Sequence, residues 1–292
     1  MSGAAWAALS GAGFGLFQAL NAKAIRELDS VYASTFFQLL VAAAVLALAS
    51  LATEGVSELA DATAWGLIAF ALAGIVHFFV GWTTLNFSQA RIGAARTSPL
   101  LSTTPVFGLF FAAVLLSDLP RWAALGGIAL TIAGAYLISD PGGGQRARLR
   151  DSGFALATAA AWALSPIFTL EGLEGLDSPL LGVTIGMLAA ALGYGVLLGA
   201  SRVPLRGGIG TQTAFALKLA AGVVVALATW GRWVSLEDAA VPVVLALQLL
   251  SVPVVLVLAP MISGRHIEVV TLRIWAGAAL VMAGSLLLIL IA

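Results

Sequence analysis

The chain has 292 residues, of which 61% are hydrophobic and only 10% are charged, and its mean hydropathy is +1.04. A soluble domain carries about a quarter charged residues, so this composition excludes an ordinary soluble protein and predicts a multi-pass membrane protein. The formal net charge is zero, which gives no support to nucleic-acid binding. The absence of cysteine excludes disulfides, thiolate metal sites and cysteine nucleophiles.

Apolar segments follow one another along the whole chain, each with about the 20 residues that a membrane-spanning helix needs. The N-terminus lacks the positively charged start of a signal peptide, so the first segment is expected to be a spanning helix. Transmembrane barrels alternate polar and apolar residues over about ten positions, whereas these segments are continuously apolar. The expected fold class is therefore an all-α polytopic membrane protein with ten transmembrane helices. The segments cover residues 3–22, 31–52, 64–86, 97–117, 122–139, 152–170, 179–200, 211–231, 239–262 and 272–291.

Residues 94–138 contain a proline-bearing span followed by a glycine-bearing span. Pro105 lies near the middle of the first, and it removes one helical N–H, which bends a helix. Gly127 and Gly134 lie in the second, where small residues let two helix backbones approach closely. The stretch therefore predicts a kinked membrane helix, a tight turn and a closely packed partner helix.

The two halves of the chain repeat at an offset of 148 residues. Trp82 matches Trp230 at this offset, and Pro105 matches Pro253. The predicted organisation is a first five-helix unit over residues 1–139, a Gly-rich and basic linker over 140–151, and a second unit over 152–292. Because five is odd, the second unit is expected to be inverted in the membrane. Inverted repeats are a recurrent design of transporters that work by alternating access.

These features resemble the EamA-type family of the drug/metabolite transporter superfamily. The resemblance rests on residues 94–138, their weaker echo over 253–288 and the plan of five helices plus five. It implies ten helices around a central cavity and small metabolites, such as amino acids, as substrates. The family's glutamate after the fourth span is replaced here by Asp118, and Glu268 fills that place in the second half, two residues late.

Positive charges predict the orientation in the inner membrane. All lysines and arginines except Arg121 and Arg232 lie in the odd-numbered connections or at helix ends near them, Lys218 included. The positive-inside rule places such connections in the cytoplasm and hence both termini outside. The resemblance more often implies cytoplasmic termini, and the charge bias is followed here.

Polar side chains within spans are costly in lipid and tend to face a cavity or another helix. Gln18 and Asn21 share one face of the first span, where interhelical hydrogen bonding and ligand contact both remain open. His77 is expected to be the only ionisable side chain at mid-membrane depth, with a structural hydrogen bond, cavity lining or proton coupling as alternatives. Trp82 either belongs to an interfacial belt or forms, with Trp230, a wall or gate of the cavity.

Further candidates surround the two prolines. Arg96 begins the fourth span, where it either snorkels to the interface or binds a substrate carboxylate. Ser98 and Thr103 precede Pro105, and hydroxyls near a membrane proline often pair with the freed backbone. The expected gating residues are Pro105 and Pro253. The expected substrate-binding residues are Gln18, Asn21, His77, Trp82, Arg96, Ser98, Thr103, Trp162, Ser165, Trp230 and Gln248.

The spans contain no catalytic dyad, metal-binding motif or paired carboxylates, so no enzyme activity and no cofactor are expected. The expected partners are a small-molecule substrate and the lipid bilayer, and a duplicated chain can be complete as a monomer. The expected function is transport of small metabolites by alternating access at a central cavity. The alternative is a non-transporting membrane scaffold or sensor. Three glycine pairs are typical of close helix packing, namely Gly11–Gly15, Gly182–Gly186 and Gly195–Gly199.

Overall fold

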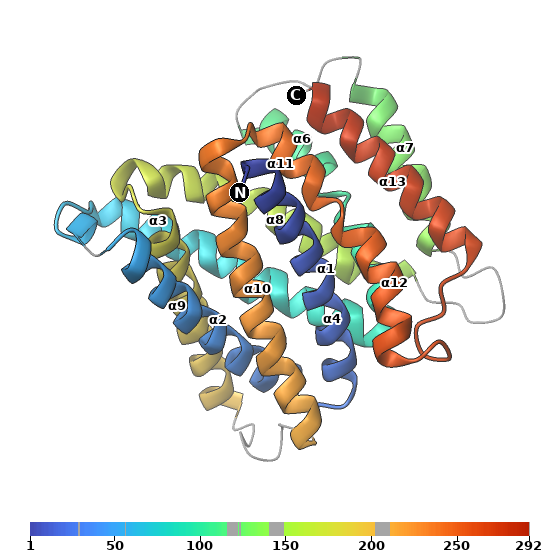
Figure 1. The fold of residues 1–292 in the computed structure, drawn as a ribbon, viewed down its shortest axis with the longest axis horizontal. Helices are drawn as coiled ribbons and strands as arrows, with labels where there is room; N and C mark the ends of the chain where they lie inside the picture. Colours follow the sequence, from blue (N-terminus) through green and yellow to red (C-terminus); the bar gives the residue numbers. More distant parts are fainter. Residues whose placement is uncertain are drawn as a thin grey trace.

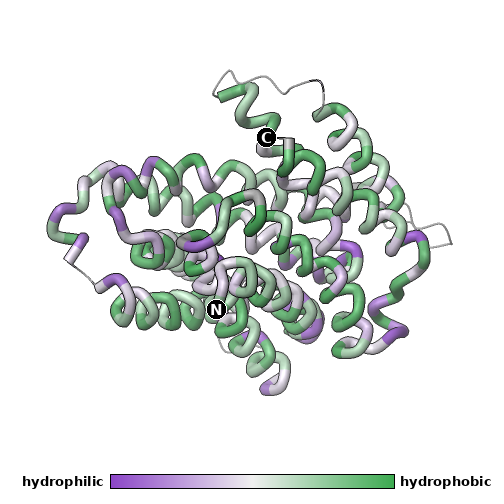
Figure 2. Tube along the Cα trace, turned by 45° about the horizontal axis from the view of Figure 1, so that its top comes forward, coloured by the Kyte–Doolittle hydropathy of each residue, from purple (hydrophilic) through white to green (hydrophobic). Residues whose placement is uncertain are grey.

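The computed structural model describes residues 1–28, 30–55, 57–115, 122, 124–139, 149–201 and 211–291. Within these ranges the regular structure is entirely helical. Figure 2 shows that the helices are apolar along most of their length and that hydrophilic residues gather at their ends and in the connections. This distribution suits helices that cross a lipid bilayer. Their apolar side chains face lipid or one another, and their backbone hydrogen bonds are satisfied within each helix.

The first half begins with two long helices and continues with helices that are subdivided. The third predicted span consists of three consecutive helical segments, the middle one π-helical, and the fourth consists of two. The helices of this half are α1 (Gly3–Arg26), α2 (Val31–Thr53), η1 (Ser57–Leu59), α3 (Ala64–Gly74), η2 (Ile75–Gly81), α4 (Trp82–Ile92), α5 (Ala94–Leu101), α6 (Thr104–Leu115) and α7 (Ala124–Ser139).

The second half repeats this order with fewer interruptions. Its first helix begins at Leu149, so the end of the predicted linker is helical, while residues 140–148 and Asp118 lie outside the described residues. The helices are α8 (Leu149–Gly175), α9 (Pro179–Ser201), α10 (Gln212–Asp238), α11 (Val241–Gln248), α12 (Ser251–Ser263) and α13 (Leu272–Ile291).

Every predicted span coincides with a helix or with a pair or trio of consecutive helical segments. Eight of these stretches are long and apolar enough to cross a membrane. The 16-residue α7 is apolar but shorter, and the 24-residue α1 does not belong to the eight. The chain is thus an all-α polytopic membrane protein, and the count of ten spans stays a prediction.

The packing of the helices follows the repeat. α1 lies at the centre against α10 and α12, and α3 packs on α8 (Figure 1). α2 packs on α9, and α7 packs on α13 at one edge of the molecule. When the bounds of α2 are shifted by 148 they become 179–201, which are the bounds of α9. The same shift takes α5 to 242–249, within one residue of α11 at each end.

The break between α5 and α6 has a local cause. Pro105, the second residue of α6, has no N–H with which to bond the carbonyl of Leu101. The hydroxyl of Thr104 donates to that carbonyl instead, at 2.6 Å, and the hydroxyl of Thr103 donates to the carbonyl of Leu100 at 2.7 Å. A hydroxyl thus pairs with the carbonyl that Pro105 leaves free, but it belongs to Thr104, and the Ser98 hydroxyl has no partner among the described residues. Pro253 follows the matching break, which separates α11 from α12.

Glycines bring helix backbones into contact at several crossings. A Cβ atom added to Gly186 would lie 2.9 Å from the carbonyl oxygen of Phe70 and 3.0 Å from the Cα atom of Gly74. Two further pairs, Gly127 with Gly284 and Gly134 with Gly277, make the same kind of approach between α7 and α13. The prediction of close packing is wrong for Gly195 and Gly199, because both are exposed on α9 and no described atom lies within 4 Å of an added Cβ.

These two environments on one helix give a paired stability test. Gly186→Leu should lower the melting temperature of the detergent-purified protein, because overpacking against a backbone costs about 1–3 kcal/mol. Gly195→Leu, in the same helix, should leave the melting temperature within error. Equal melting temperatures for the two variants would contradict the close approach of α9 to α3.

Candidate functional site

The π-helical segment η2 brings three predicted residues into direct contact. The ring of His77 stacks on the indole of Trp162, with centroids 5.3 Å apart and planes 13° from parallel. His77 Nδ1 shares a hydrogen bond with the Ser165 hydroxyl at 2.9 Å. The indole N–H of Trp162 donates to the His77 carbonyl at 3.3 Å. Residues from both halves of the chain thus form one half-buried aromatic and polar site.

The π-helix itself is stabilised by side chains from other helices. A π-helix is rare and often marks a functional position, because its wider turn misaligns backbone groups. The hydroxyl of Tyr194 from α9 donates to the carbonyl of Phe79 at 3.2 Å and shares a hydrogen bond with Thr83 at 2.6 Å. Tyr194 is fully buried. The sequence gives no sign of this role, since an isolated Tyr within a span is compatible with many environments.

Aromatic rings continue the site toward the centre of the bundle. Trp82 is 2% exposed and packs against Phe17 and Phe78, with ring centroids 6.0 and 5.2 Å away. It therefore lies in the interior and not in an interfacial belt. Trp230 packs at the edge of the same cluster, and its buried indole N–H has no partner among the described residues. Arg232, assigned from sequence to an even-numbered connection, belongs to α10.

A second polar cluster surrounds Lys218, in the second turn of α10. The Lys218 ammonium donates to the side-chain carbonyl oxygens of Asn21 at 2.5 Å and of Asn86 at 3.1 Å. The Asn21 amide donates to Asn86 and to Gln89 at 2.7 and 2.6 Å, and the Asn86 amide donates to Thr35 at 2.6 Å. Helices α1, α2, α4 and α10 meet at this cluster.

The burial of Lys218 corrects two expectations. The residue was counted with the cations near the odd-numbered connections, but it is 0% exposed. His77 is therefore not the only ionisable side chain buried within a span. The position of Lys218 near the start of α10 suggested a side chain that reaches the membrane interface. The available signal of a buried cluster was the presence of polar residues within spans, namely Asn21 in the first span and Asn86 and Gln89, about one helical turn apart, at the end of the third.

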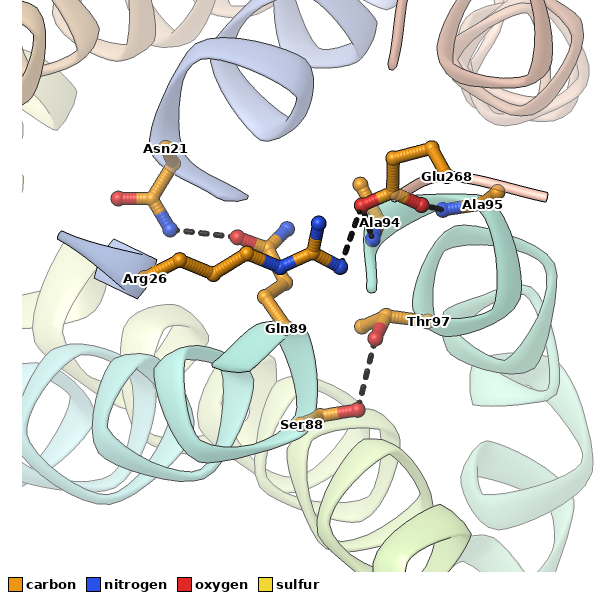
Figure 3. A network of polar contacts seen from close by, with 8 residues as sticks. All are labelled: Asn21, Arg26, Ser88, Gln89, Ala94, Ala95, Thr97 and Glu268. Atoms are coloured by element: carbon orange, nitrogen blue, oxygen red, sulfur yellow. Dashed lines mark hydrogen bonds and ion pairs between the residues drawn. The ribbon is translucent and has the colours of Figure 1, made fainter. Parts of the chain in front are cut away.

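A third polar group closes the end of the bundle where α1 ends and α5 begins. Figure 3 shows the carboxylate of Glu268, from the α12–α13 connection, facing the first turn of α5. It accepts hydrogen bonds from the backbone N–H groups of Ala94 at 3.0 Å and Ala95 at 3.2 Å, and it pairs with Arg26 at 2.9 Å. A carboxylate at a helix N-terminus is stabilised by the helix dipole. Gly93 makes room for it with a φ of +80°.

A pocket of about 160 Å³ adjoins this ion pair. Arg26, Arg91, Arg96 and His266 line it together with Glu268. Arg91 pairs with Asp151 at 2.9 Å. Arg96 is half-buried and makes no hydrogen bond or ion pair to any residue that the structure describes. The predicted cation at the start of the fourth span therefore faces a pocket and remains available to an anion.

The other predicted residues do not converge on one point. The Gln248 amide donates to the Ser10 hydroxyl at 3.0 Å and to the Ala7 carbonyl at 3.3 Å, which joins α11 to α1. Gln18 and Ser98 are buried, and each has a side-chain oxygen without a partner among the described residues. Pro253 borders an apolar pocket of about 380 Å³ with Val254, Val257 and Leu258. No group of three His, Asp or Glu residues suited to a metal occurs in the described ranges.

Comparisons with known proteins found a similar family, a similar curated protein and a similar fold. Residues 1–140 match the EamA-like transporter family. A protein of Streptantibioticus cattleyicolor, named as a probable terminal-alkyne amino-acid exporter, is 29% identical over 103 residues. That match covers 35% of this chain and 31% of the exporter. A solved structure described only as "Crystal structure of protein" superposes with a TM-score of 0.63 at 18% identity, covering 97% of this chain and 99% of the other, which shows the fold alone.

The contacts of Glu268 predict that replacing its carboxylate with an amide destabilises the protein. Glu268→Gln should lower the free energy of unfolding by about 1–3 kcal/mol, because it removes the charge that Arg26 and two helix amides bind. Thermal unfolding in detergent measures this loss. Glu58→Gln, on an exposed residue of η1, is the control and should leave the melting temperature unchanged. If Arg26→Ala and Glu268→Gln were additive in the double variant, the ion pair would not stabilise the protein.

Proposed function

We propose that this chain, whose residues 1–140 belong to the EamA-like transporter family, carries small amphipathic metabolites across the inner membrane by alternating access. The observation that carries the proposal is the His77–Trp162–Ser165 site. It joins one half of the chain to the other, inside the bundle, with aromatic faces and only a few hydrogen-bonding groups. Such a site suits a solute with an apolar side chain and a polar end.

The similarity of the two halves supports a mechanism in which one half moves relative to the other. The predicted units, 1–139 and 152–292, have helix bounds that coincide at an offset of 148, and the packing of α1 on α10 has its counterpart in α3 on α8. An inverted pair of units provides a gate at each side of a central site. The Arg26–Glu268 pair would hold one of these gates closed, and the helix breaks before Pro105 and Pro253 would let the helices bend.

Amino acids are the substrate class that we propose. The S. cattleyicolor relative is named as a probable amino-acid exporter, and the same class fits the aromatic and polar site around Trp162. Export is the proposed direction for the same reason. The polar groups of His77 and Ser165 bond each other here and would exchange this contact for a substrate amine or carboxylate.

Uptake into liposomes tests the proposal. Purified protein should give saturable uptake of one or more labelled amino acids, from a panel that also contains other amphipathic metabolites. Trp162→Ala should reduce that uptake about tenfold, which corresponds to about 1.4 kcal/mol of lost binding free energy. Trp275→Ala, on the exposed face of α13, is the matched control. Absence of saturable uptake for every compound would favour the scaffold or sensor.

A pH gradient distinguishes two roles of His77 in the same liposomes. Uptake that requires the gradient and is lost in His77→Ala would assign proton coupling to this residue. Gradient-independent uptake would make His77 a packing and hydrogen-bonding residue, and His77→Ala would then lower affinity together with Trp162→Ala. Both outcomes are compatible with transport, and they separate a coupled carrier from a uniporter or exchanger.

The orientation of the chain in the membrane can be tested with a fused reporter. We propose that both termini lie outside, because the cations at the ends of α1, α4 and α12 gather at the side of the odd-numbered connections. A reporter enzyme that is active only in the periplasm should be active when it is fused to the C-terminus, and a reporter that is active only in the cytoplasm should be inactive there. Activity of a cytoplasmic reporter at the same position would reverse the assignment.

A further inference from the structure

In the cluster around Lys218, some hydrogen-bond donors have no acceptor. The side-chain oxygens of Asn21, Asn86 and Gln89 already accept hydrogen bonds from within the cluster. The amide nitrogen of Gln89 is buried and has no partner among the described residues. The Lys218 ammonium has three hydrogens, and two acceptors for them lie among the described residues, the side-chain oxygens of Asn21 and Asn86. A buried donor without a partner costs about 1–3 kcal/mol.

The cluster also lacks a negative charge. Within the described part of the chain, the ion pairs are Arg26–Glu268 and Arg91–Asp151, and neither includes Lys218. Glu268 is engaged by Arg26 and by the first turn of α5. A fully buried ammonium without a carboxylate is costly, and charged groups in this situation within membranes commonly mark a substrate or ion pathway.

The position of the cluster connects it with the aromatic site. Phe17 lies one turn before Asn21 in α1, and Leu85 lies one turn before Gln89 in α4. Both apolar side chains belong to the buried cluster that contains Trp82 and, at its edge, Trp162. A cationic, donor-rich group thus lies directly beside an apolar and aromatic one.

We propose that Lys218 and Gln89 bind the carboxylate of the transported solute, an inference that rests on the proposed transport function. When the bundle opens, one carboxylate oxygen would replace Asn21 and Asn86 as acceptors of the ammonium, and the other would accept from the Gln89 amide. A singly charged carboxylate matches the single cation, whereas a doubly charged phosphate would need more. The transported class is therefore carboxylic acids with an apolar side chain.

The first test compares phenyl-bearing ligands that carry a carboxylate with phenyl-bearing ligands that carry none. The detergent-purified protein should be stabilised against heat by L-phenylalanine and phenylpropionate. At equal concentration, L-phenylalaninamide and phenethylamine should bind at least about tenfold more weakly. Lys218→Met should lose the preference for the acids. Equal stabilisation by acids, amide and amine, absence of stabilisation by both acids, or an unchanged preference in Lys218→Met would each overturn the proposal.

A second variant decides the matter if Lys218→Met does not fold. Gln89→Glu supplies the missing carboxylate from the protein itself, so it should raise the melting temperature by about 2–4 °C and abolish stabilisation by phenylpropionate. Gln212→Glu makes the same change at the exposed start of α10 and should alter neither. A Gln89→Glu protein that still responds to phenylpropionate would overturn the proposal. Failure of the transport function would appear separately, as absent liposome uptake despite binding of the acids.

Discussion

A polar group buried in this bundle can find a partner only inside the protein, because lipid offers none. This constraint explains the local details of the structure. Thr104 donates to the carbonyl that Pro105 leaves free, Tyr194 donates to a carbonyl of the π-helix, and Glu268 accepts from the first amides of α5. At each of these three positions a side chain completes the hydrogen bonding of the backbone, and at two of them it comes from a distant part of the chain. The irregular positions are consequently also the positions at which separate parts of the chain are joined.

Three polar contacts with the second half of the chain follow one another along α1. Gln248 contacts the start of this helix, Lys218 contacts Asn21 in its last third, and Glu268 contacts Arg26 at its end. All three partners come from the second half of the chain. A rotation or shift of α1 relative to α10 and α12 must therefore exchange all of these bonds, and a solute that supplies replacements for some of them would favour the shifted arrangement. Such an exchange would link binding to movement in the way that the proposed alternating access requires.

The helices, the helix breaks and the role of the threonines could be predicted, because they follow from hydropathy, from Pro105 and from neighbours in sequence. The contact among His77, Trp162 and Ser165 could be anticipated only as a set of candidates, since the pairing depends on how η2 packs on α8. Lys218 could not be placed, because a cation near a helix start is equally compatible with the interface. Glu268 lies in a connection whose path depends on tertiary packing, and the π-helix leaves no periodic signal. Gly195 and Gly199 show that a pair of small residues does not by itself predict close packing, because this pair lies on a face of α9 that meets no described helix.

The contact of Glu268 with α5 has a consequence for biosynthesis. The first amides of α5 receive their acceptor from residue 268 of a 292-residue chain. Because translation proceeds from the N-terminus, the fourth span waits for almost the entire protein before its inner end is complete. The helices of the first half can insert early, yet the contact between α5 and Glu268 forms only when the last connection has emerged from the ribosome. Quality control that senses unfinished membrane segments would therefore act on this protein until the end of its synthesis.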